Sequence, residues 1–508
     1  MVILEKSRTE NSLKNVKITF IVYFITMFFQ FINRTMFLKF LSIEYLGING
    51  LFSNVLSMLN LAELGIGSAM VYEMYRPCAK NDIDTIKKIM YLYKKIYIII
   101  GIFILIVGSL LTPFLNFFIN TPPQNIGNIH YYYLLYVFNI AISYFFTYKR
   151  SLIICFQKQY ISSITTCVKN VLVCFFQILI LFLTKNYTLY LMIQIIFTFL
   201  ENVVISRIAN RMYPYLKDKA TLPDSSIINS IKKNVFAMFF HKIGTVIVTG
   251  TDNLIITKFV SLTATGLYSN YLIVISALNN LISQIFSSLT ASVGNLIVEK
   301  NNKQTYYVFK KVFFLNFMLF LFTSVVMNLI FNDFISLWVG EKYTFNNIVV
   351  FFISLHYFSG GMRKAVLTFK DAAGLFWNDR YKPIVESIAN LIFSIPLTIK
   401  FGICGTLLGT IITNIFIAGL IEAYVLYKNC FKINVVHYLF SLIKYYILFF
   451  GCMLITIYIG ESINFSFFSN IIVKSIVGCL ITFVLICIFC FKTNEFKDVI
   501  RLIKNKMI

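Results

Sequence analysis

Four basic residues lie inside long apolar segments of this chain of 508 residues: Lys169, Lys242, Arg363 and Lys364. A charge within an apolar span is costly, so it usually faces a cavity or an ionic partner. Lys and Arg are also the residues that bind phosphate oxygens. We therefore predict that the four cations form a vestibule that binds an anionic group such as a phosphate. The alternative for Lys169 and Lys364 is that their side chains extend to the lipid headgroups.

Two opposite charges occupy nearly matching positions in the first and seventh apolar segments. When Lys39 is aligned with Lys258, Arg34 matches Asn253, which is adjacent to Asp252. Facing helices at equal depth would bring Arg34 and Asp252 together, and we predict an ion pair that closes an outer gate. The alternative is that each charge pairs locally or reaches the membrane interface.

Uncharged polar residues recur every three or four positions in several apolar segments, and this spacing places them on one helix face. Side chains that both donate and accept hydrogen bonds suit a ligand that carries hydroxyl groups. We predict that such faces line a cavity, with the lining residues Gln30, Asn60, His241, Thr245 and Asn280. Small polar residues at the same spacing also allow membrane helices to pack closely, which is the alternative for serines on these faces, such as Ser57 and Ser276.

Glu63 is an acid within the second apolar segment. An unpaired carboxylate there would take up a proton or bind a cation. The residue therefore either binds a coupling proton or sodium ion, or pairs with a lysine across the cavity. Both readings stay open at this stage.

The sequence offers little for catalysis. There are only four histidines, no HExxH motif and no glycine-rich phosphate loop between a strand and a helix. No loop on the outer side is long enough, or rich enough in acids, histidine or arginine, for a catalytic domain. We expect a protein that is not an enzyme and that uses no cofactor and no metal.

The composition defines the elements that carry these residues. The chain is 58% hydrophobic and 13% charged, which is too little polar surface for a soluble globule of this size. A spanning helix needs about 20 apolar residues, and about fourteen such segments occur. We predict an all-α polytopic membrane protein with spans that begin near Val16, Leu46, Leu92, Ile129, Ile161, Tyr187, Asn234, Gly266, Val308, Ile348, Ile384, Cys404, Tyr438 and Phe468.

The net charge of +24 follows this topology rather than a nucleic-acid partner. Lys and Arg crowd alternate loops, as at 76–95, 207–233 and 300–311, whereas intervening loops such as 120–129 carry none. Basic loops stay in the cytoplasm. We predict an even number of spans in the cell membrane with both termini cytoplasmic.

A short motif occurs twice. GLFSN at 50–54 and GLYSN at 266–270 each follow a K-F-x-S sequence by a few residues. Six spans separate the copies, so we predict two parallel six-helix lobes related by a pseudo-twofold axis along the membrane normal. The predicted organisation is an N-lobe at 1–206, a basic cytoplasmic linker at 207–233, a C-lobe at 234–430, and two additional helices with a basic tail at 431–508.

Four stretches together resemble the Wzx-type repeat-unit flippases of the multidrug/oligosaccharidyl-lipid/polysaccharide (MOP) exporter superfamily. They are EYLGINGLFSNVLSMLNLAELGIGSAMVYEMY at 44–75, GTDNLIITKFVSLTATGLYSNY at 250–271, TASVGNLI at 290–297 and GMRKAVLTFKDAAGLFWNDRYKPIVE at 361–386. The resemblance implies alternating access between two lobes. It also implies transfer of a polyprenyl-pyrophosphate-linked oligosaccharide from the inner to the outer leaflet, for surface polysaccharide biosynthesis. On this basis the group expected in the vestibule of Lys169, Lys242, Arg363 and Lys364 is the pyrophosphate, and the hydroxyls expected at the polar faces are those of the sugar.

The resemblance also implies membrane lipids, a polysaccharide polymerase and other assembly proteins as partners. A cation-coupled multidrug exporter of the same fold is the alternative, although such an exporter is expected to favour acids in its cavity. A membrane-embedded polymerase or ligase is a further alternative, which would need a sizeable outer catalytic loop.

Overall fold

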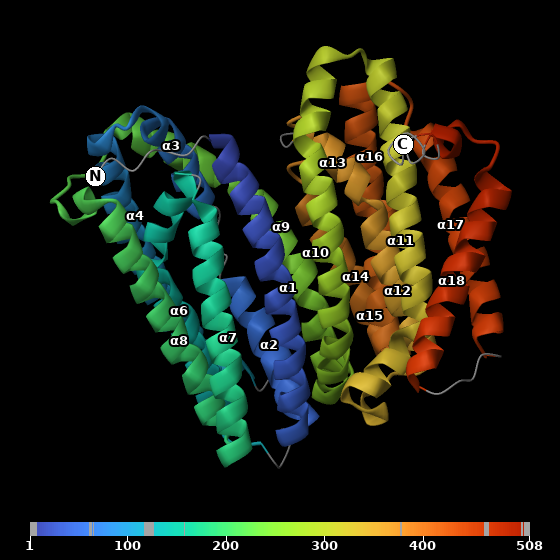
Figure 1. Ribbon diagram of the computed structural model, residues 1–508, viewed down its shortest axis with the longest axis horizontal. Helices are drawn as coiled ribbons and strands as arrows, with labels where there is room; N and C mark the ends of the chain where they lie inside the picture. The colour runs from blue at the N-terminus through green and yellow to red at the C-terminus, as the bar shows by residue number, and fades with distance from the viewer. Residues whose placement is uncertain are drawn as a thin grey trace. The chain divides into compact units, whose positions relative to one another are not determined.

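The protein was analysed as a computed structural model, which describes residues 8–59, 63, 66–115, 126–156, 158–375, 378–461, 467–498 and 501. Within these residues every regular element is a helix and no strand occurs, which confirms the predicted all-α fold. The chain forms two compact units, Met1–Gly250 and Thr251–Ile508. Each unit is a bundle in which long helices run along one another (Figure 1).

The first unit contains the helices of the predicted spans one to six and most of the seventh. Its elements are α1 (Arg8–Phe40), α2 (Ile43–Leu59), α3 (Ile66–Lys80), α4 (Ile83–Leu110), η2 (Thr112–Phe114), α6 (Ile129–Cys155), α7 (Gln159–Thr184), α8 (Tyr187–Met212), η3 (Pro214–Lys217) and α9 (Ser225–Phe259). Helix α6 packs against both α4 and α8, and α7 packs against α1 and α8.

The second unit takes the end of α9 and everything after it. Its elements are α10 (Leu262–Glu299), α11 (Asn302–Val339), η4 (Glu341–Tyr343), α12 (Asn347–Met362), α13 (Lys364–Ala372), α14 (Lys382–Phe401), α15 (Ile403–Ile412), η5 (Thr413–Gly419), α16 (Leu420–Leu426), η6 (Tyr427–Phe431), α17 (Val436–Glu461) and α18 (Phe467–Cys490). The last two spans, α17 and α18, both pack on α11.

Within the described residues, each apolar segment expected from the sequence falls on one helix or on consecutive helical segments. Nine helices in the described part of the chain are long and apolar enough to span a membrane. Helices α8 and α9 extend into the predicted linker 207–233 from both ends, and the division between the units falls inside α9.

Short polar residues define several helix starts. The Asn186 side chain accepts hydrogen bonds from the backbone amides of Thr188 and Leu189 at the start of α8. Asn128 and Asn346 cap α6 and α12 in the same way. Because a first helical turn leaves backbone N–H groups without partners, these caps determine where the spans begin.

Helices α14 and α15 form a close hairpin because glycines occupy its two critical positions. Gly402 joins them with φ of +60°, a conformation that favours glycine. A Cβ atom added at Gly405 would lie 1.9 Å from the backbone oxygen of Leu397. Beyond this hairpin the span becomes π-helical in η5 and η6. Wider turns of this kind are frequent at functional sites.

Candidate functional site

A polar cavity of about 220 Å³ lies within the first unit. Five helices contribute to its wall, namely α1, α2, α6, α7 and α8. The lining residues are Asn33, Asn49, Leu135, Tyr136, Asn139, Gln177, Tyr190, Leu191, Gln194 and Ile195. Amides and phenols therefore make up most of the wall, with leucine and isoleucine between them.

Hydrogen bonds fix the orientation of the amides in this cavity. The Asn33 amide nitrogen donates to Gln177 Oε1 at 2.8 Å and to the Tyr190 hydroxyl at 3.4 Å. Gln177 in turn donates to the backbone oxygen of Tyr190 at 3.1 Å. The hydroxyls of Tyr136 and Tyr187 both donate to Asn49 Oδ1. The wall is thus a preorganised set of donors and acceptors, which is the chemistry that binds hydroxyl groups.

Arg34 adds a positive charge beside this cavity. Its guanidinium lies close enough to Tyr136 and Tyr190, two of the lining residues, to interact with them electrostatically. A cation next to neutral hydrogen-bonding groups suits a ligand that carries both hydroxyls and a negative charge.

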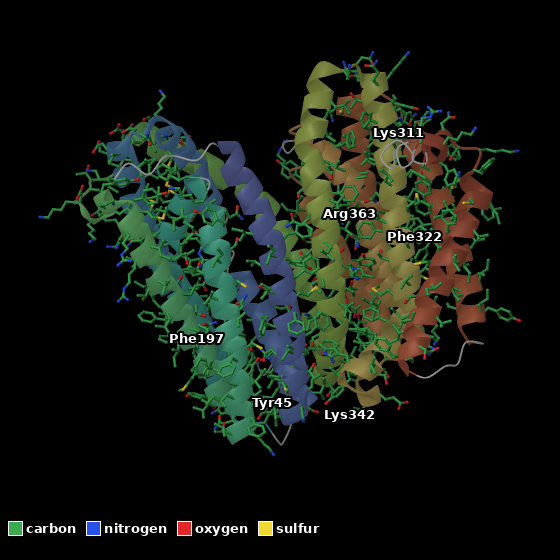
Figure 2. All side chains as sticks on the ribbon, viewed as in Figure 1. Tyr45, Phe197, Lys311, Phe322, Lys342 and Arg363 are labelled. Carbon is green, nitrogen blue, oxygen red and sulfur yellow. The ribbon has the colours of Figure 1, made fainter. Side chains whose placement is uncertain are left out.

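Arg363 lies in the second unit (Figure 2), where it is part of a buried ion cluster. Its guanidinium binds Glu422 through two hydrogen bonds, of 3.0 and 2.7 Å. It also donates to Glu386 at 2.9 Å and to Asn414 of η5 at 2.5 Å. Lys382 lies 2.6 Å from each of the two carboxylates. Two cations thus balance two carboxylates, and Asn414 of the π-helical segment η5 supplies one further hydrogen-bond acceptor for Arg363.

A related cluster occurs in the first unit. Arg150 of α6 binds Glu201 of α8 at 2.5 Å, and Lys169 of α7 approaches the same carboxylate at 3.5 Å. Thr166 donates to Glu201 at 2.7 Å. In both units the arginine comes from the fourth span of its half and a carboxylate comes from the sixth. The two halves of the chain therefore share an arginine–glutamate ion pair in addition to the sequence motif repeated at 50–54 and 266–270.

Glu63 accepts a hydrogen bond of 2.6 Å from the Tyr97 hydroxyl. Tyr93 donates to Tyr97 at 3.2 Å and lies 3.0 Å from the Ser151 hydroxyl oxygen. A chain of hydroxyl groups therefore leads from the Glu63 carboxylate to α6. In the described part of the chain, no lysine or arginine forms an ion pair with Glu63.

Asp252 is bound within its own unit. Its carboxylate accepts a hydrogen bond of 2.9 Å from Thr410 on α15. Thr410 also accepts one of 3.0 Å from the buried Asn390 on α14, and Thr251 donates to Asn390 at 3.2 Å. These contacts attach the end of α9 to the α14–α15 hairpin.

The predicted site residues are distributed over both units. Lys169 is held in the first unit by Glu201, and Arg363 is held in the second by Glu386 and Glu422. Lys364 is half-buried at the start of α13. Arg34 and Asp252 belong to different units, so their ion pair stays a prediction.

Two of the predicted lining residues, Gln30 and Asn280, are exposed in the structure, and neither lines the cavity of the first unit. Asn60 and the side chains of His241, Lys242 and Thr245 lie outside the described residues. Their predicted roles therefore stay predictions.

Sequence reasoning missed most of the cavity. It singled out Gln30 and Arg34 in the first span, but not Asn49, Tyr136, Gln177 or Tyr190. One signal was present, since Gln177 and Gln194 are single amides within otherwise apolar runs, CFFQILILF and LMIQIIF. A buried amide in a span usually has a partner or a ligand.

Comparison with known proteins assigns the chain to a family. A family model described as "Polysaccharide biosynthesis protein" matches residues 12–291. No curated protein sequence matches the chain.

Solved structures with the same fold include the lipid II flippase MurJ in an inward closed conformation, with a TM-score of 0.64, 13% identity, and 96% of this chain and 99% of that chain covered. They also include an inward-facing MATE family multidrug resistance transporter of the MOP superfamily, with a TM-score of 0.59, 13% identity and coverages of 82% and 97%. A third is a variant of the Vibrio cholerae MATE transporter VcmN, with a TM-score of 0.58, 15% identity and coverages of 84% and 99%. The chain therefore has the fold of the MOP superfamily transporters.

Proposed function

The chain belongs to the polysaccharide biosynthesis protein family, and from that premise we propose that it flips a lipid-linked oligosaccharide across the cell membrane. The proposed cargo is a polyprenyl-pyrophosphate-linked repeat unit, which moves from the inner to the outer leaflet by alternating access. The polar cavity in the first unit is the observation that carries the proposal. A carbohydrate needs many hydroxyl-binding groups in one place, and this cavity has amides and phenols on five helices.

The pyrophosphate needs cations that are able to exchange partners. Arg34 lies beside the cavity-lining tyrosines, and Lys242 and Lys364 remain the proposed phosphate-binding lysines. Arg363 and Lys169 contact carboxylates in this conformation. In the proposed mechanism these two residues bind phosphate only after they release Glu422, Glu386 or Glu201.

A cation-coupled multidrug exporter is the second candidate. It is favoured by two acids, Glu63 and Asp252, for which the hydrogen-bond partners in the described residues include the hydroxyls of Tyr97 and Thr410. Carboxylates bound by neutral groups are suited to exchange protons or sodium ions. The same acids would serve ion coupling in a flippase, so they do not by themselves identify the cargo.

The proposal is tested by gene deletion with the initiating glycosyltransferases left intact. Lipid-linked intermediates and surface polysaccharide are then quantified, with the wild-type gene on a plasmid as the control. The expected result is accumulation of the completed repeat unit on its lipid and loss of surface polysaccharide. Unchanged intermediates with normal polysaccharide, together with increased sensitivity to cationic drugs, would favour the exporter.

A further inference from the structure

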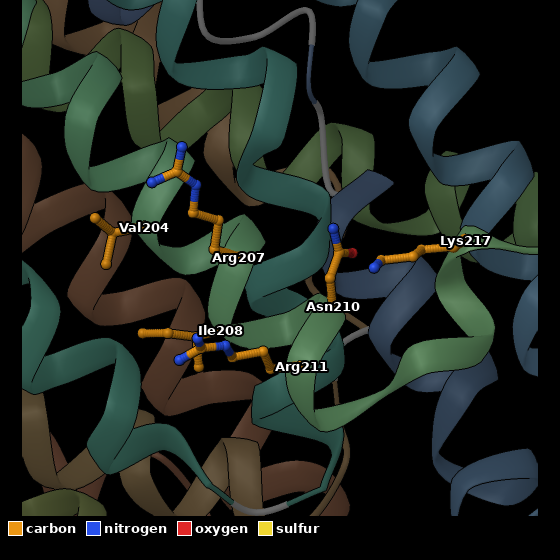
Figure 3. Close-up of a pocket in the computed structure, with 6 residues that line it drawn as sticks. All are labelled: Val204, Arg207, Ile208, Asn210, Arg211 and Lys217. Carbon is orange, nitrogen blue, oxygen red and sulfur yellow. The ribbon is translucent and has the colours of Figure 1, made fainter.

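A second hollow in the first unit is basic rather than neutral. It has a volume of about 480 Å³ and lies at the end of α8 and in η3. Its lining residues are Val204, Arg207, Ile208, Asn210, Arg211 and Lys217 (Figure 3). Three of these six residues are cations and none is an acid. From the sequence alone, these cations were expected only to contribute to the positive charge of the cytoplasmic loop at 207–233.

The polar groups available in this pocket are donors. Asn210 Oδ1 already accepts a hydrogen bond of 3.1 Å from Lys149, whose ammonium also donates to Ser206 at 2.8 Å. The amide nitrogen is therefore what Asn210 can offer to a ligand. Figure 3 shows the Lys217 side chain pointing toward Asn210. A pocket in which three cations and one amide offer N–H groups favours an anion.

The cations of the pocket are not neutralised locally. Asp218, the acid next to Lys217, is bound by Lys87 at 3.6 Å. Among the described residues, no carboxylate forms an ion pair with Arg207, Arg211 or Lys217. Their positive charge is therefore available to a ligand.

Toward the N-terminus of α8 from the pocket, the same helix face is apolar. Exposed apolar residues recur along it at intervals of one to four positions, with exposed fractions of 38% to 50% at Met192, Ile196, Phe199, Leu200 and Val204. At 1.5 Å per residue this stripe is roughly 18 Å long. It is thus close to the thickness of one leaflet, about half of a hydrocarbon core of roughly 30 Å.

We propose that the pocket binds the phosphate headgroup of an anionic membrane lipid and that the lipid's acyl chain lies along the apolar stripe of α8. Arg207 and Arg211 contact the phosphate from the helix, and Lys217 contacts it from η3. The transition from an apolar to a basic helix face at Arg207 places this site at a membrane interface, where headgroups lie. The site does not depend on the flipping proposed above.

The test measures lipid binding by native mass spectrometry of the full-length protein in detergent. The protein is titrated with phosphatidylglycerol and, in parallel, with phosphatidylcholine of the same acyl chains. The test variant is Arg207→Gln with Arg211→Gln. Its matched control is Lys300→Gln with Lys303→Gln, which removes the same charge from two exposed lysines near the start of α11. Thermal unfolding of each variant checks that it is folded.

The expected result is preferential binding of phosphatidylglycerol by the wild type and the control variant. Loss of two cations near a headgroup should weaken this binding roughly tenfold or more in the test variant. Equal binding of both lipids would overturn the proposal, and so would equal affinities of the test and control variants. Displacement of phosphatidylglycerol by equimolar inorganic pyrophosphate would assign the pocket to a soluble phosphate instead.

Discussion

Arg363 and Glu422 form a two-pronged ion pair, with Nε 3.0 Å from Oε2 and Nη2 2.7 Å from Oε1. The Glu422 side chain is 0% exposed and that of Arg363 is 14% exposed. Paired geometry of this kind is the strongest that an arginine and a carboxylate can form. The pair also connects the end of α12 to α16, between the two π-helical segments.

Replacing Glu422 by Gln should lower the free energy of unfolding by about 3–5 kcal/mol, because it leaves a buried guanidinium without its main partner. Thermal unfolding of the purified protein in detergent measures the effect. Asp84→Asn is the matched control, since Asp84 forms a pair of 2.8 Å with Lys88 and is 68% exposed. That exposed pair should contribute less than about 1 kcal/mol. Equal melting temperatures for the two variants would contradict this interpretation of the cluster.

Gln177→Leu should impair transport without unfolding the protein. The substitution removes the acceptor of the Asn33 amide from the cavity wall, and loss of one neutral hydrogen bond to a ligand costs roughly 2- to 10-fold. Complementation of the deletion strain, measured by surface polysaccharide, gives the effect. Gln159→Leu makes the same change at an exposed position of the same helix. Normal transport in both variants would show that the cavity is not part of the transport path.

Charge reversal at Arg34 or at Asp252 should impair transport if the two residues form the predicted outer gate. The double variant Arg34→Asp with Asp252→Arg should then recover part of the activity, because the ion pair is restored with the opposite polarity. Thr410→Val, which removes the hydroxyl that binds Asp252 and Asn390 but leaves both charges in place, separates gate closure from local structure. A double variant as inactive as either single variant would count against a direct pair.

Glu63→Gln should abolish the response of transport to a proton or sodium gradient while leaving downhill transport measurable. The reason is that an amide cannot take up the proton or cation that a carboxylate binds. Reconstituted vesicles with and without each gradient provide the measurement. Tyr97→Phe is the comparison variant, because it removes the hydroxyl donor at 2.6 Å but keeps the acid. A gradient response that survives Glu63→Gln would exclude Glu63 as the coupling group.

Gly405→Ala should destabilise the second unit, because the added methyl group would lie 1.9 Å from the Leu397 backbone oxygen. A backbone atom cannot rotate away, so α14 and α15 must separate at a cost of roughly 1–3 kcal/mol. The yield of monodisperse protein and its melting temperature are the measurements. Gly451→Ala has no atom within 4 Å of the new methyl group and should be neutral. Similar yields and melting temperatures for both variants would show that the hairpin accommodates a methyl group at position 405, contrary to this prediction.

The amino-acid sequence by itself determined the class of this protein and the location of its helices. The apolar segments near Leu92, Ile129 and Tyr187, for example, correspond to α4, α6 and α8. Such segments are readable because the transfer free energy of a span is a sum over neighbouring residues. The motif repeated at 50–54 and 266–270 likewise needed no tertiary information.

Only the tertiary structure decided which charges are paired. From the sequence, Arg363 was expected to bind phosphate in a vestibule. In the structure Glu422 lies against Arg363, 59 residues earlier in the chain, and against Lys382. The cavity wall brings Asn33 to Gln177 across 144 residues in the same way. Hydropathy and spacing report which face of a helix a residue occupies, but the energy of an ion pair or hydrogen bond depends on the distance between residues on different helices, which packing alone determines.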